Sequence, residues 1–363
     1  MKRMKITEAI NELLNDNTAF VAFRQPQTEE PQLFAGGDFV CVESLASVSE
    51  NGFVFYPFHA DDEKIRCLKP QQICSGWELQ IDFSELKKQQ NRLIELSDQP
   101  FIASKNEFLK QAKSLISKLK NNELSKVVLS RIIAHEIDEV VDWGRKFEQI
   151  CRKYPSAFVY ILSDGHGLFW TGATPETLLS ANNQKAYTMA LAGTQPAKTN
   201  AEELYSWKQK ERDEQQYVVD YIADILKDLS VKKLNISETS THLAGKLAHL
   251  LNHINFKIPA SISALELAQK IHPTPAICGL PAEKALELIK QTEPHKRSYY
   301  SGFLGISQDN MSADLYVNLR CVQVIGNILY SYVGGGLTAD SNPEKEWEET
   351  VLKSQTMLSL FTK

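Results

Sequence analysis

The 363-residue chain lacks the features that mark several large classes of protein. Its formal net charge of -5 provides no basic field, so neither nucleic acid nor an anionic membrane surface has an electrostatic reason to bind it. No segment approaches the roughly 18 continuous apolar residues of a membrane span. Residues 1–20 contain no apolar run of the signal-peptide kind and fit an amphipathic helix instead. We therefore predict a cytoplasmic protein that binds neither nucleic acid nor membrane.

Cysteine is scattered along the chain without any CxxC pair, which argues against a zinc ribbon or a redox motif. We expect reduced thiols throughout. The cysteines are Cys41, Cys67, Cys74, Cys151, Cys278 and Cys321.

The chain also lacks a Gly/Ser-rich or Pro-rich linker and a short-period repeat. Hydrophobic residues at 43% and charged residues at 23% are typical of a globular protein with a sizeable core. We predict one structural domain, in which residues 1–104 form an N-terminal part of the sheet body and residues 105–363 carry the chemistry.

Hydrophobic periodicity predicts an α+β architecture with helices packed on sheets. Residues 106–120 have apolar positions at helical spacing, and the following apolar segment KVVLSRII indicates a buried strand. Further predictions are a hairpin of 157–162 and 168–171 around Asp164-Gly165, long helices over 201–229 and 343–360, three strands within 302–333, and a solvated helix or loop over 86–98.

Two candidate catalytic residues stand 50 positions apart. Lys126 begins the strand KVVLSR, where a lysine at an exposed strand edge is the simplest interpretation. In GATPE, Thr174 suits a helix N-cap, Pro175 the first helical position and Glu176 the first turn, so Glu176 is predicted to begin a helix. The helix dipole would lower the pKa of Glu176, so action as an acid near neutral pH requires burial or a nearby anion.

Carboxylates recur at helical spacing on the two long predicted helices. Glu211 and Glu214 are three residues apart, and Glu346, Glu349 and Lys353 fall at i, i+3 and i+7 on one helix face. Mg²⁺ prefers oxygen ligands and is commonly held by one or two carboxylates together with the substrate. Two such helices are therefore able to hold a magnesium ion jointly, although solvated helix faces with ion pairs give the same pattern.

Several other segments are suited to a ligand. LAGT, residues 191–194, ends an apolar stretch in a flexible turn, and HPTPAICGLP places His272 and Ala276 in a rigid loop or short helix. Arg320 can fork onto a carboxylate, and the amides of Gly334 to Gly336 can form an anion nest. Taken singly, these features also have structural interpretations. His272 fits a structural histidine, Arg320 an ion-paired arginine, and LAGT and the glycine run fit tight turns.

Together these segments resemble the chorismate-utilising enzymes, a family of isochorismate synthases, salicylate synthases, anthranilate synthase large subunits and aminodeoxychorismate synthases. The resemblance covers roughly residues 105–363, and an ordered set of this kind is highly specific. It implies the family's fold, in which antiparallel sheets pack together, helices flank them and the active site lies between. The segments, in order, are KVVLSR, GATPE, LAGT, KERDEQ, HPTPA, Arg297, NLR, GGGLTADSNPEKEWEET and Lys353.

The resemblance also implies roles for matching positions. Lys126 is expected to be the base for the incoming water, and Glu176 the acid at the departing hydroxyl. Glu214 and Glu349 are the implied magnesium ligands, with Glu346 close by. The implied substrate-binding residues are Gly193, Thr194, His272, Ala276, Arg320, Gly334, Gly335, Gly336 and Lys353.

Two positions bear on the subfamily. Ala192 stands where aminodeoxychorismate synthases carry a nucleophilic lysine, and Lys126 stands where anthranilate synthases resemble QVVLSQ. A lysine fits the activation of water, which ammonia addition does not need. We predict a magnesium-dependent isochorismate synthase. A salicylate synthase, which also eliminates pyruvate, is less favoured because HPTPA resembles the isochorismate synthase version, and a silent chorismate-binding protein is the alternative from another class.

The chain departs from the family pattern at a few positions. Gln215 stands where histidine commonly follows the metal-binding glutamate, Gly335 where alanine is common, and Gln195 where arginine often follows AGT. His295-Lys296 replaces the usual Phe-Asp before Arg297. These differences bear on fine positioning more than on the chemistry.

The expected partner is chorismate as a small-molecule substrate, with Mg²⁺ as cofactor. We expect neither an attached glutaminase-like region nor a glutaminase subunit, and we predict a monomer or weak homodimer. The sequence leaves open whether the product serves menaquinone, a siderophore or another pathway.

Overall fold

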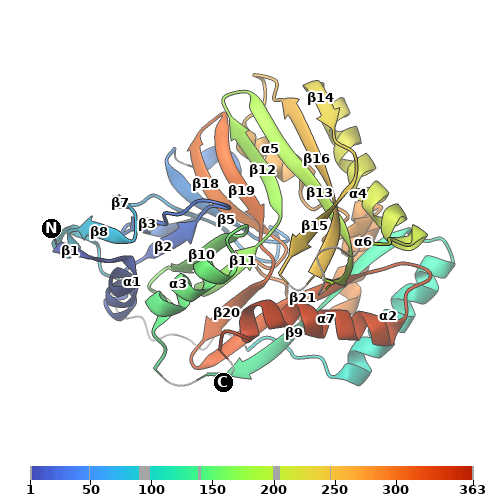
Figure 1. The fold of residues 1–363 in the computed structure, drawn as a ribbon, viewed down its shortest axis with the longest axis horizontal. Helices are drawn as coiled ribbons and strands as arrows, with labels where there is room; N and C mark the ends of the chain where they lie inside the picture. Colours follow the sequence, from blue (N-terminus) through green and yellow to red (C-terminus); the bar gives the residue numbers. More distant parts are fainter. Residues whose placement is uncertain are drawn as a thin grey trace.

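The computed structural model describes residues 2–48, 50–89, 99–137, 140–198, 205–245 and 247–361. Two large antiparallel sheets dominate it, and helices cover their outer faces (Figure 1). The predicted α+β class with packed antiparallel sheets is therefore confirmed.

The first sheet has nine strands, and two of them form a long, uninterrupted antiparallel pair. Strand β9 pairs with β21 in register from Val127 opposite Leu337 to Glu136 opposite Ile328. In spatial order the strands are β17 (Gly279–Leu280), β9 (Lys126–Glu136), β21 (Ile328–Leu337), β20 (Cys321–Ile325), β11 (Phe169–Thr174), β10 (Phe158–Ser163), β2 (Phe20–Arg24), β3 (Gln32–Ala35) and β7 (Gln72–Ser75).

The second sheet has ten strands, with β15 (Ser240–Ala244) added beside β16. A separate two-stranded sheet joins β1 (Lys2–Lys5) to β8 (Glu78–Ile81). The other strands of the second sheet are, in spatial order, β14 (Lys232–Ile236), β16 (Leu247–Lys257), β13 (Lys185–Pro196), β12 (Thr177–Asn182), β19 (Ser312–Val317), β18 (Phe303–Asp309), β5 (Gly52–Tyr56), β6 (Ile65–Leu68) and β4 (Phe39–Val42).

The helices bury one apolar stripe each. In α2, Ser104 and Glu107 form a capping box, and Phe108, Ala112 and Leu115 are buried at helical spacing. Helix α7 lies along β21 and brings its first half close to the glycine run of that strand (Figure 1). The helices are α1 (Ile6–Asn15), α2 (Lys105–Lys120), α3 (Trp143–Lys153), α4 (Gln209–Asp228), α5 (Ala264–Ile271), α6 (Ala282–Thr292) and α7 (Pro343–Leu358), with short 3₁₀ turns at Leu45–Ser47 and Phe83–Glu85.

An aromatic core joins the inner faces of the two sheets. Phe158 of β10 stacks on Tyr316 of β19 with ring centroids 4.2 Å apart, and Phe55 of β5 stacks on Tyr299 at 3.9 Å. Strands from the first hundred residues complete both sheets, because β2 pairs with β10 and β5 pairs with β18. This interleaving supports the proposal of a single domain.

One sequence-based prediction of local structure is wrong at an important place. Residues Pro175 and Glu176 do not begin a helix, because they connect strands β11 and β12. Thr174 does not cap a helix, since its hydroxyl donates to the carbonyl of Val317 in the neighbouring chain segment. Pairing of Thr177 with Tyr316 in β19 outweighs the local capping signal.

Other predicted boundaries shift by smaller amounts. LAGT is not a terminal turn, because it lies inside β13 at an irregularity in the pairing with β16, where Gly193 has φ +63°. The helix predicted over 201–229 begins at Gln209, and its first four positions lie outside the described residues. The region 302–333 holds β18, β19, β20 and the start of β21 instead of three strands.

The N-terminal amphipathic helix is confirmed as α1, preceded by the short strand β1. Most of the solvated segment predicted over 86–98 lies outside the described residues, and Leu86 at its start is buried. No helix within the described part of the chain is long and apolar enough to cross a membrane.

Candidate active site

A pocket lies where the central strand β21 meets helices α4 and α7, the β11–β12 connection and the bulge of β13. The structure therefore gathers, from segments far apart in the sequence, nearly all of the residues singled out above. The predicted site residues among those lining it are Glu176, Gly193, Thr194, Glu214, Ala276, Arg320, Gly334, Gly335, Gly336, Glu346, Glu349 and Lys353.

Lys126 lies directly behind the glycine run and is completely buried, so the interpretation as an exposed edge lysine is wrong. Its Nζ is 2.7 Å from Oε1 of Glu214. A side chain at Gly336 would place its Cβ 2.8 Å from Lys126 Cε, which shows how closely the lysine packs under this strand. The absence of a side chain at Gly336 leaves room for the lysine and the carboxylate together.

Glu176 is buried in the short connection between β11 and β12, with 4% of its surface exposed. Its carbonyl accepts a hydrogen bond from the backbone N–H of Val317, which fixes the connection. Burial raises the pKa of Glu176 to about 8, while the positive charges of Lys126 and Lys353 oppose the rise. This carboxyl is therefore protonated in most molecules at neutral pH, as a proton donor requires, and burial is the cause.

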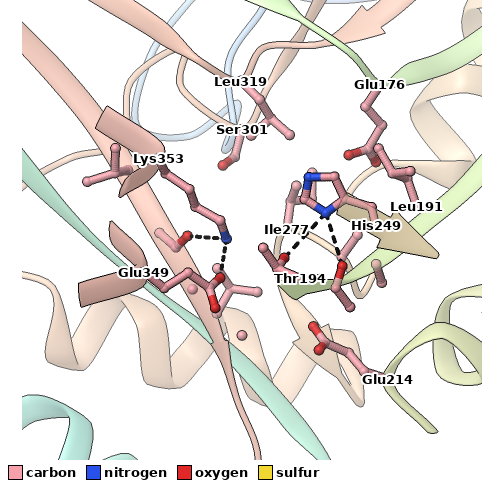
Figure 2. A pocket seen from close by; sticks show the side chains of 18 of the residues that line it. Glu176, Leu191, Thr194, Glu214, His249, Ile277, Ser301, Leu319, Glu349 and Lys353 are labelled. Carbon is pink, nitrogen blue, oxygen red and sulfur yellow. Dashed lines mark hydrogen bonds and ion pairs between the residues drawn. The ribbon is translucent and has the colours of Figure 1, made fainter. Parts of the chain in front are cut away.

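Three carboxylates in the pocket are each paired with a lysine, and the two helices supply them as predicted. Glu214 is on α4 and Glu349 is on α7 (Figure 2). Glu346 is also on α7. The ion pairs are Lys126–Glu214 at 2.7 Å, Lys353–Glu349 at 2.6 Å and Lys210–Glu346 at 3.2 Å. Lys210, in the first turn of α4, was not singled out from the sequence because a lysine on a polar helix face carries no distinguishing signal.

The pKa values of two of these carboxyls shift in opposite directions. Burial acts to raise the pKa of Glu214, but the ion pair with Lys126 outweighs it and the net shift is downward. Burial raises the pKa of Glu346, and repulsion from Glu349 adds to the rise. Glu214 is thus held as a carboxylate, the form that a metal ion requires.

All three carboxylates face the glycine run. A Cβ at Gly336 would lie 2.7 Å from Glu214 Oε1, and one at Gly335 would lie 3.3 Å from Glu346 Oε2 and 3.8 Å from Glu349 Oε1. Such hard oxygen donors suit Mg²⁺. Across the described ranges, no three His, Cys, Asp or Glu side chains are grouped closely enough to hold a metal by themselves. The donor set therefore fits a magnesium ion that takes one or two protein carboxylates and completes its shell with other oxygens.

The end of the pocket at Arg320 and Lys353 is cationic. Arg320 has a left-handed backbone with φ +49°. Within the described part of the chain its guanidinium makes only long contacts, with the Lys353 carbonyl at 3.4 Å and Thr356 Oγ1 at 3.3 Å. Lys353 Nζ also donates to the carbonyl of Gly334 at 2.9 Å. Burial lowers the pKa of Arg320, but the guanidinium stays charged at neutral pH. This end is suited to an anionic group of a ligand.

His249 of β16 lines the pocket and was missed by the sequence-based predictions. Its Nδ1 lies 3.0 Å from the Gly193 carbonyl, so this nitrogen carries the proton, and 3.3 Å from Thr194 Oγ1 (Figure 2). Burial lowers its pKa to about 3, helped by Arg320 and Lys353. Its Nε2 is buried without a partner among the described residues and is free to accept a hydrogen bond. A histidine in an apolar strand is usually structural, so no sequence pattern distinguished this one.

His272 is the one predicted substrate-binding residue that the structure does not bring to the pocket. It ends α5 and is buried, with its Nε2 3.3 Å from the carbonyl of Phe58 and its ring edge against Tyr56 and Phe303. Burial lowers its pKa to about 4. HPTPA turns after this residue, so Ala276 reaches the pocket and His272 packs behind it.

Two of the residues that depart from the family pattern are buried and make specific side-chain contacts. Gln215 is buried, and its Nε2 donates to the Ala190 carbonyl and to Asn252 Oδ1, both at 2.8 Å, which ties α4 to the second sheet beside Glu214. His295 lies 2.9 Å from Ser130 Oγ through its Nε2.

Arg297, which follows His295-Lys296, forms a buried ion pair with Glu293. It also donates to the carbonyls of Ile277 and Val128, both at 2.8 Å. Val128 and Ile277 both line the pocket, so this arginine connects two of its walls.

Comparison with known proteins identifies the family. A family model described as "Chorismate binding enzyme" matches residues 7–362, so the match extends beyond residues 105–363 into the first hundred residues. Isochorismate synthase EntC of Escherichia coli K12 is 28% identical over 247 residues. That alignment covers 66% of this chain and 63% of EntC, so the chain spans less than two thirds of that relative's length.

Solved structures agree over almost the whole chain. DhbC of Bacillus anthracis, described as a 2,3-dihydroxybenzoate-specific isochorismate synthase, is 27% identical with a TM-score of 0.78, covering 96% of this chain and 98% of DhbC. The menaquinone-specific isochorismate synthase MenF of Escherichia coli has a TM-score of 0.82 over 98% of this chain and 91% of MenF, and at 20% identity it supports the fold alone. The chain therefore belongs to the chorismate-binding enzyme family.

Proposed function

We propose that the protein is an isochorismate synthase, which converts chorismate to isochorismate by adding water at C2 and releasing the C4 hydroxyl. The observation that carries this proposal is a buried carboxyl with a raised pKa that lines a pocket with cationic groups, with a fully buried lysine nearby. Glu176 has a pKa of about 8, and it is close enough to Lys126 for their charges to interact. The relative EntC and the structural neighbour DhbC are both named as isochorismate synthases, which supports the same activity for this chain.

The proposed chemistry needs one proton acceptor and one proton donor. Lys126 takes a proton from the attacking water, the ring double bonds shift, and Glu176 protonates the C4 oxygen as it leaves as water. One water enters and one leaves, so the product is an isomer of the substrate. Lys126 Nζ lies 2.7 Å from Glu214 Oε1, so the proposed base and a proposed magnesium ligand are direct neighbours.

The walls of the pocket would supply the binding groups for a dianion. Arg320 and Lys353 would hold one carboxylate of chorismate, and the other would lie beside the Gly334 to Gly336 strand, which lines the same pocket. His249 Nε2 would accept a hydrogen bond from a substrate hydroxyl. Positioning of this kind lowers the barrier because the reacting groups are held at short range before the reaction begins.

Magnesium is part of the proposal. Glu214 and Glu349 would hold the ion, with Glu346 close by. Bound there, Mg²⁺ would neutralise the ring carboxylate and orient the substrate. A cytoplasmic location, a monomer or weak homodimer and the absence of a glutaminase subunit stay predictions of the sequence.

The test is to incubate the purified protein with chorismate, with and without Mg²⁺, and to identify the products by chromatography and mass spectrometry. We expect isochorismate, without pyruvate, only when Mg²⁺ is present. Salicylate with pyruvate would assign the protein to the salicylate synthases, anthranilate in the presence of ammonia would contradict the role of Lys126, and no turnover would favour a silent chorismate-binding protein.

A matched pair of variants makes the result specific. Glu176→Gln keeps the size of the side chain but removes the acidic proton, and it should abolish product formation. Glu287→Gln changes an exposed carboxylate on α6 that pairs with Lys284, and it should leave turnover unchanged.

A further inference from the structure

Ser301 is a pocket residue to which neither the sequence nor the proposed chemistry gives a role. It lines the pocket, and only 1% of its surface is exposed. The hydroxyl lies near Tyr300, yet Oγ has no hydrogen-bond partner of good geometry in the described parts of the chain. Figure 2 shows the Ser301 oxygen pointing into the pocket from beside Leu319, with Lys353 on one side and Glu176 on the other. A buried hydroxyl without a partner is costly unless a ligand satisfies it.

The backbone at Ser301 is also strained. Its φ is +60°, in the left-handed region that serine rarely adopts. A serine cannot stand at position 302 instead, because a Cβ at Gly302 would lie 2.0 Å from the Tyr56 carbonyl oxygen. Such strain costs about 1 kcal/mol or more and persists where the surrounding contacts impose it, commonly at functional sites.

The surrounding contacts here come from Asn318, which is fully buried. The Asn318 carbonyl accepts the N–H of Ser301 at 2.9 Å, and the Asn318 N–H donates to the Gly302 carbonyl at 2.8 Å. The side chain of Asn318 donates to the Tyr299 carbonyl at 2.9 Å and accepts from the Tyr160 hydroxyl at 2.7 Å. The turn that carries Ser301 is therefore fastened to the segment that leads into Arg320.

Arg320 stands two residues after Asn318 and shares the left-handed conformation, with φ +49°. Asn318 thus connects the turn that carries Ser301 with the turn that carries Arg320. Both turns have a left-handed residue, and both present a side chain to the same pocket. A guanidinium and a hydroxyl on adjacent segments form a natural pair of donors for a carboxylate.

We propose that the Ser301 hydroxyl donates a hydrogen bond to the substrate carboxylate that Arg320 holds, which makes Ser301 a substrate-binding residue. The inference rests on the proposed function because it requires a substrate with a carboxylate at this end of the pocket. It adds a neutral donor beside the arginine, so it contributes to affinity and orientation and takes no part in proton transfer.

Two variants separate the hydroxyl from the strain. Ser301→Ala removes the hydroxyl and keeps the Cβ in the left-handed conformation, whereas Ser301→Gly removes the hydroxyl and also relieves the strain. Ser298 is the matched control, since it lies in the same turn with φ +50° but its hydroxyl donates to Glu63 outside the pocket. Each variant, including Ser298→Ala and Ser298→Gly, is measured by steady-state kinetics, by calorimetric titration with chorismate in the absence of Mg²⁺, and by thermal unfolding.

We expect Ser301→Ala to raise the KM for chorismate, and the calorimetric Kd, by about tenfold, with kcat within about twofold. Ser301→Gly should raise KM equally while Tm increases by about 2 °C, because glycine adopts this φ freely. Ser298→Gly should raise Tm without changing KM. A purely structural serine would not combine weaker binding with higher stability.

The proposal is overturned if KM and Kd of Ser301→Ala stay within twofold of the unmodified protein. A protein that binds chorismate without converting it would refute the proposed function alone, because the Kd comparison still tests Ser301. A protein that neither binds nor converts chorismate would overturn both proposals.

Discussion

At the scale of single residues, the protonation of Glu176 decides whether it can act as an acid. Burial raises its pKa to about 8, well above the ordinary value near 4.5. The carboxyl is in its donor form below this pH and ionises as the pH rises through it. We expect kcat/KM to fall above pH 8 with an apparent pKa near this value, as measured in a pH series of initial rates.

The same shift has a consequence for stability. The folded protein binds the Glu176 proton more tightly than the unfolded chain, so this group favours the folded state fully below about pH 4.5 and loses the contribution as pH rises through about 8. In Glu176→Gln the alkaline limb of the rate profile should disappear together with most of the activity. An alkaline limb that persists in residual activity would assign the titration to another group.

Lys126 makes the second residue-scale prediction. Lys126→Ala should lower kcat by about 10²-fold or more, because the proton acceptor is lost. It also leaves Glu214 without its buried partner, which costs about 3 kcal/mol of folding free energy. Thermal unfolding must therefore accompany the kinetics, and the comparison is made below the variant's Tm.

The control is Lys227→Met, which removes an exposed lysine of α4 that pairs with Asp224. It should leave kcat unchanged. A folded Lys126→Ala protein with unchanged kcat would exclude Lys126 as the base.

At the scale of elements, the glycine run of β21 lies between the carboxylates of α4 and α7. Gly336→Ala would put a methyl group 2.7 Å from Glu214 Oε1 and 2.8 Å from Lys126 Cε, so both side chains must move. We expect loss of activity and weaker Mg²⁺ binding, measured by calorimetric titration of the metal.

Gly335→Ala is its matched control in the same strand. The added methyl group would meet Glu346 Oε2 at 3.3 Å and Glu349 Oε1 at 3.8 Å, which small side-chain shifts can accommodate. Because alanine is common at this position in the family pattern, this variant should keep most of its activity. Equal loss in both variants would mean that the strand requires glycine for its backbone alone.

The two helices also set the metal dependence. Removal of divalent cations with a chelator should abolish turnover, and Mg²⁺ should restore it. Glu349→Gln should raise the Mg²⁺ concentration for half-maximal activity by about tenfold, because one charged oxygen ligand is lost. Glu344→Gln, in the first turn of α7 where the carboxylate pairs with exposed Lys105, should not change it. Metal titration by calorimetry checks both variants without relying on catalysis.

At the scale of the whole molecule, the first hundred residues and the rest share two sheets. Without residues 1–104, β10 loses its partner β2, and β18 loses its partner β5. Exposed strand edges would remain, together with an aromatic core that lacks Phe23, Phe34, Phe39, Phe53 and Phe55. We expect a fragment of residues 105–363 to be insoluble or to lack a cooperative thermal transition, as followed by circular dichroism. A cooperatively folded, active fragment would contradict the single-domain proposal.

Periodicity in the sequence determined the elements whose burial is set locally. Helix α2 and strand β9 follow from apolar spacing alone, since one buries a stripe and the other both faces. The ordered motifs also determined the family and nearly all of the pocket, because each motif keeps its residue types at fixed spacing. Glu214, Glu349 and Lys353 were predictable for that reason.

Only the tertiary structure decided the features that depend on contacts between distant segments. Glu176 lies between strands because pairing with β19 outweighs a Thr-Pro capping signal, and its proton is held by burial that no local pattern specifies. Lys210, His249 and Ser301 reach the pocket, whereas His272 packs behind it. Burial, charge and strain at these positions arise from the packing of segments far apart in the chain, and a local sequence pattern does not specify that packing.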